Sequence, residues 1–208
     1  MYYLQFYFLS IFLSNFIMNK IIGILGFQGA FFEHKNILDQ LKVSNLIVKT
    51  NKDLQKIDYL IIPGGESTVI SKFINEQNLL MPLKEFILEE KRPVMGTCAG
   101  AILLSKIILD KNDLKPGLIP AIDIVTERNS YGSQINSFIK NIKLDKIGNF
   151  NCVFIRAPRF KEINDPECII LGYDNNNPII IKKNNILLCT FHPELEGTKV
   201  HEYFINNF

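Results

Sequence analysis

The sequence contains no tryptophan, and its four cysteines show no C-x-x-C spacing. In a chain of 208 residues, such scattered cysteines form neither the framework of a disulfide-rich secreted protein nor a zinc site, so a reducing compartment is the simpler assumption. A dominant charge is also lacking, because 23 basic and 21 acidic residues leave a formal net charge of +2. Without a basic patch or a long run of like charge, nucleic acid is not an expected partner. We expect neither a metal nor a cofactor.

The first 17 residues are almost wholly apolar and lack the basic start of a secretory signal. They are also shorter than the roughly 20 apolar residues that a membrane helix needs. We therefore expect an N-terminal extension over residues 1–18 and a single domain over residues 19–208 that is not membrane-bound. The extension is either translated upstream sequence or an atypical targeting segment that would place the protein in an organelle. Otherwise we expect a cytoplasmic protein.

Apolar strands alternate with helical stretches along the domain. Residues 19–26, 46–49 and 58–62 predict buried strands, and residues 27–41 predict a helix with one apolar stripe. This rhythm indicates right-handed crossovers and a mainly parallel or mixed sheet flanked by helices. A hydrophobic content of 47% suffices for one such α/β domain. The loops at the carboxyl ends of the strands then form the functional site.

Gly96-Thr97-Cys98-Ala99-Gly100 separates two apolar runs, residues 93–95 and 101–109. Glycines on both sides let a sharp strand-to-helix turn thrust one residue forward. A thiol at that point lies at a helix N-terminus, where the helix dipole favours the thiolate. A cysteine after a core strand is more often structural, but the flanking glycines favour a nucleophile at Cys98.

Three other polar features each have a plain alternative. The Pro-Gly-Gly-Glu-Ser-Thr segment at residues 63–68 can present backbone N–H groups to a ligand, although such a turn is often only a turn. We interpret His34, near the start of the first helix, as a solvated or capping histidine rather than a catalytic one. Arg128 is either a bidentate clamp for a carboxylate or a solvated surface arginine.

A second catalytic candidate follows the strand predicted over residues 186–190, which pairs in a hairpin with residues 178–181. The strand runs into Phe191-His192-Pro193-Glu194. In extended backbone, side chains two apart share a face, so Glu194 can orient His192. A histidine at a strand end usually lies on the surface, but the cysteine elbow upstream favours a catalytic role for His192. It can accept the thiol proton and then protonate a leaving amine.

Together and in order, these motifs resemble class I, or triad, glutamine amidotransferases, and within them the glutaminases of vitamin B6 biosynthesis. The elbow and the His-Pro-Glu segment are typical of the whole class, and the other blocks are typical of the vitamin B6 branch. The resemblance extends from residue 19 to about residue 208. The matching segments are residues 26–30 with Glu33-His34, and residues 63–68, 96–100, 127–132, 155–158 and 192–195.

The resemblance implies a flavodoxin-like domain that hydrolyses L-glutamine to glutamate and ammonia. Cys98 would form a glutamyl thioester, His192 would act as base and acid, and Glu194 would orient His192. Backbone N–H groups of Gly65 and Ala99 would form the oxyanion hole. Ammonia would pass to a separate subunit of the hetero-oligomer that makes pyridoxal 5'-phosphate. The residues implied to bind glutamine are Gly65, Glu66, Ser67, Arg128, Ile155 and Arg156.

Two other functions remain open from the sequence. A glutaminase subunit of another biosynthetic amidotransferase would keep the chemistry and change the ammonia acceptor, but the blocks at residues 127–132 and 155–158 argue against it. A cysteine hydrolase or redox protein on the same fold commonly has a histidine directly after the elbow cysteine, or lacks the late His-Pro-Glu. Here Ala99 follows the cysteine and the late segment is present.

A chain that begins at Met18 should fold and hydrolyse glutamine at least as well as the full chain. The first strand needs only residues 20–25, and we expect no sheet position to remain for the residues before it. Circular dichroism and a glutaminase assay on both chains check this. Loss of folding without the first 17 residues would show that they pack in the domain.

Overall fold

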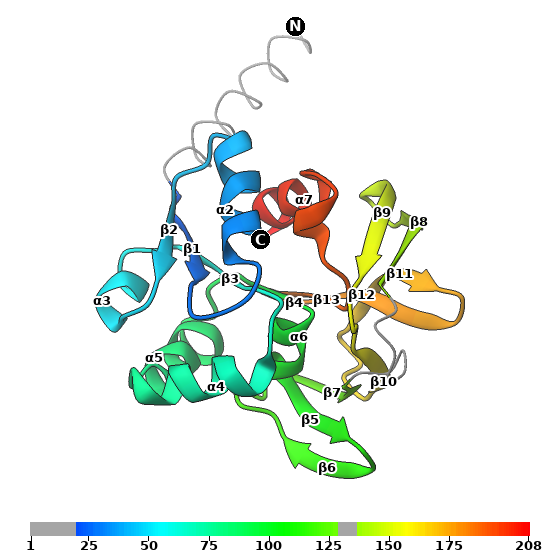
Figure 1. Cartoon of the computed structure of the whole chain (residues 1–208), viewed down its shortest axis with the longest axis horizontal. Coiled ribbons are helices and arrows are strands. Elements are labelled where there is room, and N and C mark those ends of the chain that lie inside the picture. Colours follow the sequence, from blue (N-terminus) through cyan, green and yellow to red (C-terminus); the bar gives the residue numbers. More distant parts are fainter. Residues whose placement is uncertain (1–19, 129–136) are drawn as a thin grey trace, which may run out of the picture.

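The computed structural model describes residues 20–128 and 137–208 and has a mixed seven-stranded sheet at its centre (Figure 1). The strand order is β11-β12-β13-β4-β3-β1-β2. The five strands from β13 to β2 pair in parallel, whereas β12 and β11 are antiparallel at one edge. The strands are β1 (Ile22–Leu25), β2 (Asn45–Val48), β3 (Tyr59–Ile62), β4 (Val94–Thr97), β11 (Ile169–Asp174), β12 (Asn177–Lys183) and β13 (Ile186–Cys189).

Helices cover both faces of this sheet, because its central strands are apolar on both sides. Successive residues of β3 show this, since Leu60 and Ile62 belong to one buried cluster and Ile61 to the other. Figure 1 shows α2 and α7 on one face and α4, α5 and α6 on the other. The helices are α2 (Phe31–Gln40), α3 (Asn51–Leu54), α4 (Ser67–Glu76), α5 (Leu80–Lys84) with its continuation η1 (Glu85–Glu89), α6 (Ala99–Leu104) and α7 (Lys199–Asn207).

Two smaller sheets extend the core on the side of β11 and α6. One has the order β10-β7-β5-β6, and the other is the antiparallel pair of β8 and β9. The short helix η2 (Pro193–Leu195) follows β13. The remaining strands are β5 (Ser105–Asp110), β6 (Asp113–Pro116), β7 (Ile122–Glu127), β8 (Phe138–Leu144), β9 (Gly148–Phe154) and β10 (Arg159–Ile163).

The predicted α/β fold, a mixed sheet flanked by helices, is confirmed, with one local difference. The helix expected over residues 27–41 begins only at Phe31, because residues 27–30 form a loop. The apolar run at residues 101–109 does not form one element. Helix α6 ends at Leu104, and Ser105 turns to extended backbone and begins β5.

The predicted boundary between an extension over residues 1–18 and a domain over residues 19–208 stays a prediction, since residues 1–19 lie outside the described chain. The same holds for residues 129–132 of the block at 127–132. Over the parts of the chain that are described, every helix is too short or too polar to cross a membrane.

Candidate active site

Cys98 lies at the turn between β4 and α6, in a backbone conformation that few residues adopt. Its φ is 47°, in the left-handed region, which is energetically unfavourable for any residue other than glycine. Neighbours hold the turn: the Cys98 N–H donates to the carbonyl oxygen of Cys189 on β13 at 2.8 Å. Gly100 permits the close approach of α6 to β3, because a Cβ at this position would clash with the Ile62 carbonyl. The elbow predicted from the glycine spacing therefore has the strained geometry of a nucleophile turn.

His192 and Glu194 contact each other directly, with 2.6 Å between His192 Nδ1 and Glu194 Oε1. Both side chains are buried. The extended geometry expected for this segment is wrong, because Pro193 begins the 3-10 helix η2 and His192 has a φ of −102° and a ψ of 86°. A helical turn, rather than a shared strand face, brings the carboxylate back to the imidazole. The His192 N–H anchors this turn by donating to the Val153 carbonyl at 2.8 Å.

Two buried charges stabilise each other in this pair. Burial alone would lower the pKa of His192, but hydrogen bonds to Cys98 and Glu194 and the negative charge of Glu194 raise it to about 10. Burial would raise the pKa of Glu194, but the contacts with His34 and His192 hold it below its usual value. Near neutral pH, His192 is therefore protonated on both nitrogens and Glu194 is ionised.

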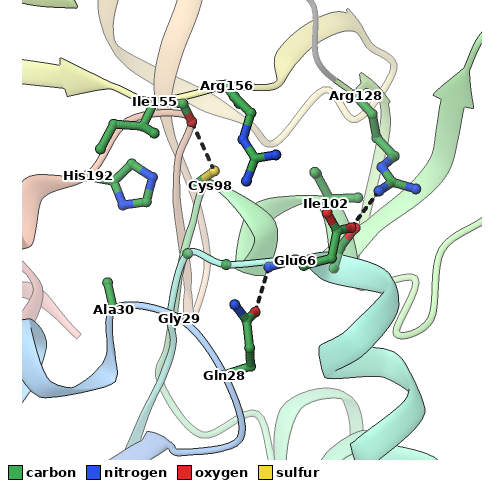
Figure 2. Close-up of a pocket in the computed structure, with 13 residues that line it drawn as sticks. Gln28, Gly29, Ala30, Glu66, Cys98, Ile102, Arg128, Ile155, Arg156 and His192 are labelled. Carbon is green, nitrogen blue, oxygen red and sulfur yellow. Dashed lines mark hydrogen bonds and ion pairs between the residues drawn. The ribbon is translucent and has the colours of Figure 1, made fainter. Parts of the chain in front are cut away.

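A pocket of about 190 Å³ opens above Cys98 (Figure 2). Cys98 Sγ lies 3.9 Å from the carbonyl oxygen of Ile155. Most of the residues expected to act here line this pocket, whereas Ala99 and Glu194 are buried beside it. The expected residues that line it are Gly65, Glu66, Ser67, Cys98, Arg128, Ile155, Arg156 and His192.

The loops after β1 and β3 form one wall of the pocket and are tied together by hydrogen bonds. Gln28 Oε1 accepts from the Glu66 N–H at 2.6 Å, and the Ala30 N–H donates to the Gly64 carbonyl at 3.0 Å. Gly64 is needed here for space, because a Cβ at this position would lie 2.9 Å from His192 Nδ1 and 3.1 Å from the Cys98 Cβ. The glycine loop can therefore approach the cysteine and the imidazole closely.

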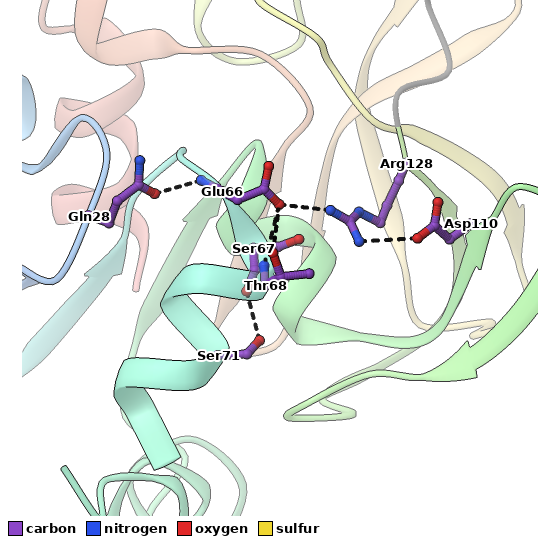
Figure 3. Close-up of polar contacts among 7 residues, drawn as sticks. All are labelled: Gln28, Glu66, Ser67, Thr68, Ser71, Asp110 and Arg128. Carbon is purple, nitrogen blue, oxygen red and sulfur yellow. Dashed lines mark hydrogen bonds and ion pairs between the residues drawn. The ribbon is translucent and has the colours of Figure 1, made fainter. Parts of the chain in front are cut away.

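Arg128 is held at the edge of the pocket by two carboxylates (Figure 3). One guanidinium nitrogen lies 2.8 Å from Glu66 Oε1, and the other lies 3.2 Å from Asp110 Oδ2 on β5. Glu66 also accepts from the Thr68 hydroxyl at 3.1 Å. Arg128 is therefore not a solvated surface arginine, because its side chain is 18% exposed and forms ion pairs with both Glu66 and Asp110.

The interpretation of His34 as a solvated or capping residue is wrong. Its side chain is fully buried between α2 and the sheet, and its Nε2 lies 3.3 Å from Glu194 Oε2. The helical pattern did carry a signal for this burial, because His34 lies three and four residues before Ile37 and Leu38 and so belongs to the buried stripe of α2. The pattern could not show the contact partner, because α2 packs against η2, which comes from the other end of the chain.

Several residues of the site were not predicted from the sequence. Gln28, Gly29, Ala30, Gly64 and Ile102 line the pocket, and all but Ile102 belong to the motifs at residues 26–30 and 63–68. Their position in these glycine-containing motifs could have indicated that they line the site. No sequence feature indicated Asp110, because it lies in an ordinary strand and meets Arg128 only through the pairing of β5 with β7.

A buried histidine between an elbow cysteine and a carboxylate, at the carboxyl ends of parallel strands, is the arrangement expected of triad glutamine amidotransferases. The chain belongs to the SNO glutamine amidotransferase family, whose model matches residues 24–208. A similar protein is the pyridoxal 5'-phosphate synthase subunit PdxT of Thermosipho africanus, 42% identical over 89% of this chain and 97% of the relative. PdxT of Caldicellulosiruptor saccharolyticus is 44% identical over 90% and 98%, respectively.

Solved structures agree with this assignment. A crystal structure titled as a glutamine amidotransferase is 34% identical and has a TM-score of 0.82, covering 90% of this chain and 99% of its own. A structure of PurLQS from Thermotoga maritima has a TM-score of 0.61 at 12% identity, covering 85% and 89%, which shows the fold alone.

The paired guanidinium predicts the effect of removing Arg128. Arg128→Ala should lower kcat/KM for glutamine by about 10- to 100-fold, mainly through KM, because charge-assisted hydrogen bonds each contribute about 1.5–3 kcal/mol. Arg128→Lys should recover only part of this loss, since an ammonium cannot reproduce the planar fork.

Steady-state kinetics over a range of glutamine concentrations measure both variants. Arg92→Ala is a matched control, because Arg92 pairs with Glu90 and is not among the residues that line this pocket. Its kinetics should stay unchanged. An unchanged KM in Arg128→Ala would exclude Arg128 from glutamine binding.

Proposed function

We propose that this chain hydrolyses glutamine to glutamate and ammonia through Cys98, His192 and Glu194, as the glutaminase subunit of a pyridoxal 5'-phosphate synthase. The observation that carries the proposal is the contact of a buried carboxylate, an imidazole and an elbow cysteine at one pocket. Identity of 42–44% to PdxT subunits over about nine-tenths of the chain supports the biosynthetic assignment.

The first half of the reaction forms a thioester. Cys98 Sγ attacks the side-chain amide carbon of glutamine, and the carbonyl oxygen takes up the electron pair as an oxyanion. His192, which carries the proton taken from the thiol, donates it to the amide nitrogen. The carbon–nitrogen bond then breaks, ammonia leaves and the glutamyl thioester remains. The raised pKa of His192 suits this step because the imidazolium is present before ammonia departs.

The second half consumes water. His192, now neutral, takes a proton from a water molecule that attacks the thioester carbon, and the thiolate is expelled as glutamate forms. Glu194 holds the imidazole in one orientation in both halves and balances its charge when it is protonated. The triad returns to its starting protonation state after one glutamine and one water are consumed.

Backbone N–H groups are proposed to stabilise the oxyanion in both halves. Ala99 is the first residue of α6, and the first N–H groups of a helix have no partner within it. Gly65 lies in the glycine loop that faces Cys98 across the pocket. Donors fixed by the fold need no reorganisation when the charge develops, which is why such sites contribute strongly to catalysis.

The rest of the pocket is suited to the zwitterionic end of glutamine. Arg128 offers the α-carboxylate the guanidinium N–H donors that Glu66 and Asp110 do not use, and Glu66 beside it offers negative charge to the α-ammonium group. Ser67, Ile155 and Arg156 complete the proposed binding residues. Ammonia released here would pass to a synthase subunit, the proposed partner in a hetero-oligomer.

The proposed function is tested first by measuring glutamate formation with and without a pyridoxal 5'-phosphate synthase subunit. A second measurement compares how much pyridoxal 5'-phosphate the mixture makes from ammonia and from glutamine. Cys98→Ala should reduce glutamine hydrolysis to background while ammonia still supports synthesis. Substantial glutamine hydrolysis by Cys98→Ala would overturn the assignment of the nucleophile.

An electrophilic glutamine analogue should label Cys98 and spare the other three cysteines, as mass spectrometry of a digest would show. Burial raises the pKa of the Cys152 thiol to about 12 and of Cys168 to about 11, and it raises that of Cys189 well above its usual value. These thiols remain protonated near neutral pH and are poor nucleophiles. Labelling of any of them at a rate similar to Cys98 would contradict this.

His192→Asn should reduce kcat more than Glu194→Gln does. The first variant removes the group that carries the proton, and general acid–base catalysis by such a group typically raises the rate by about 10²- to 10⁴-fold. The second variant keeps the imidazole and replaces only the group that orients it. Single-turnover rates of thioester formation measure the difference. A larger loss in Glu194→Gln would mean that the orientation of the imidazole limits catalysis more than proton transfer.

A further inference from the structure

Beneath the triad lies a polar cluster that the proposed mechanism does not use. His34 on α2 and His201 on α7 are both fully buried, as is the hydroxyl-bearing Thr97 at the end of β4. A buried imidazole loses its hydrogen bonds to water, so its burial destabilises the fold unless its nitrogens form hydrogen bonds within the protein. These two histidines come from helices that lie far apart in the sequence and cover the same face of the sheet (Figure 1).

The cluster joins the triad at Glu194. His34 Nδ1 lies 2.8 Å from His201 Nε2, and His34 Nε2 lies 3.2 Å from Thr97 Oγ1 and 3.3 Å from Glu194 Oε2. Glu194 Oε1 is occupied by His192, whereas Oε2 makes no hydrogen bond of ordinary geometry within the described residues. The imidazole of His34 therefore faces the free oxygen of the catalytic carboxylate.

The protonation of the cluster follows from its contacts. His34 has a lowered pKa, because burial outweighs the attraction of Glu194, and burial lowers the pKa of His201 to about 3. Both rings are thus neutral, and each carries one N–H. Two groups face Nε2: the Glu194 carboxylate, which only accepts, and the Thr97 hydroxyl, which can accept or donate. A proton on Nε2 suits both groups, and Nδ1 then accepts from the His201 Nε2–H. This leaves His201 Nδ1 bare, in agreement with its lack of a hydrogen-bond partner among the described residues.

We infer that His34 is a positioning residue for the triad: its Nε2–H, oriented by His201, fixes the carboxylate of Glu194 and thereby the imidazole of His192. The inference rests on the proposed function. It gives α2 and α7 a role in catalysis without contact with the substrate. Within the residues described, no group of three or more histidine, cysteine or acidic side chains is arranged to hold a metal ion.

Titratable groups interact with Glu194 from every element packed around it. His34 lies on α2, His201 lies on α7, and His192 lies on the pocket side. Glu33 on α2 acts on His34, and the Cys98 thiol acts on His192. Cys189 on β13 also faces the carboxylate, and its pKa is raised. Of the two groups that lower the pKa of Glu194 through its side chain, His192 belongs to the triad and His34 does not.

Removal of the His34 N–H should therefore raise the pKa of Glu194. A protonated Glu194 no longer orients His192, so glutaminase activity is lost as the pH falls through this pKa. In His34→Leu, the low-pH limb of the kcat profile should move to higher pH, and kcat at neutral pH should fall by about 10-fold or more, as for loss of a hydrogen bond to a charged group. KM for glutamine should stay within about twofold, because the pocket residues are unchanged.

The variants are compared as the full chain in complex with its synthase subunit. His34→Gln supplies an N–H where Nε2 of the imidazole lies, so it should restore most of kcat and return the limb toward its original pH. Ile37→Ala is the matched control: it removes buried apolar atoms from the same helix and carries no polar group. It should lower thermal stability without moving the limb.

A double-mutant cycle completes the test. In a Glu194→Gln background, His34→Leu should cost much less than in the original chain, because the charge that His34 fixes is gone. A wild-type pH profile and kcat in His34→Leu would overturn the inference, as would a loss that His34→Gln does not rescue. If Cys98→Ala retains hydrolysis, the proposed function fails instead, so the two failures are distinguishable.

Discussion

The site depends on one strained residue. Cys98 holds a φ of 47° because the sheet and its covering helix leave it no alternative: its N–H is committed to the Cys189 carbonyl, and Gly100 lets α6 pack directly on Ile62. Strain of this kind costs of order 1–3 kcal/mol and persists only where surrounding structure fixes the backbone. The parallel pairing of β13, β4 and β3 supplies that structure. This pairing also places the cysteine at the carboxyl ends of the strands, where the loops after β1, β3 and β13 meet.

Buried charge is the second constraint. An ionised carboxylate in the interior needs partners for both oxygens, and Glu194 finds one in His192 and faces the other in His34. The partners come from the loop after β13 and from α2, while His201 on α7 contacts His34 in turn. The helices on this face of the sheet therefore support the charge of the triad as well as covering apolar strands.

The proposed glutamine-binding end of the pocket has a different origin. Arg128 lies at the end of β7 in the smaller four-stranded sheet, and its guanidinium bridges Glu66 on the main sheet side and Asp110 on β5 (Figure 3). A residue clamped by two carboxylates keeps its fork in place before a substrate arrives, which lowers the entropy lost on binding. The proposed triad and the proposed binding residues are thus held by two sheets that meet across the pocket.

The sequence by itself determined the fold class and the positions of the elbow, the glycine loop and the His-Pro-Glu segment. These are local properties: glycine tolerates a sharp turn, apolar runs of four or five residues form buried strands, and both can be read over a few neighbouring residues. Only the tertiary structure decided that His34 contacts Glu194, that Asp110 holds Arg128, and that a 3-10 turn brings Glu194 to His192. Each of these depends on contacts between segments distant in sequence, or on a turn that the extended pattern of the preceding strand hides. Such pairings follow from how helices and strands pack, and no local pattern records them.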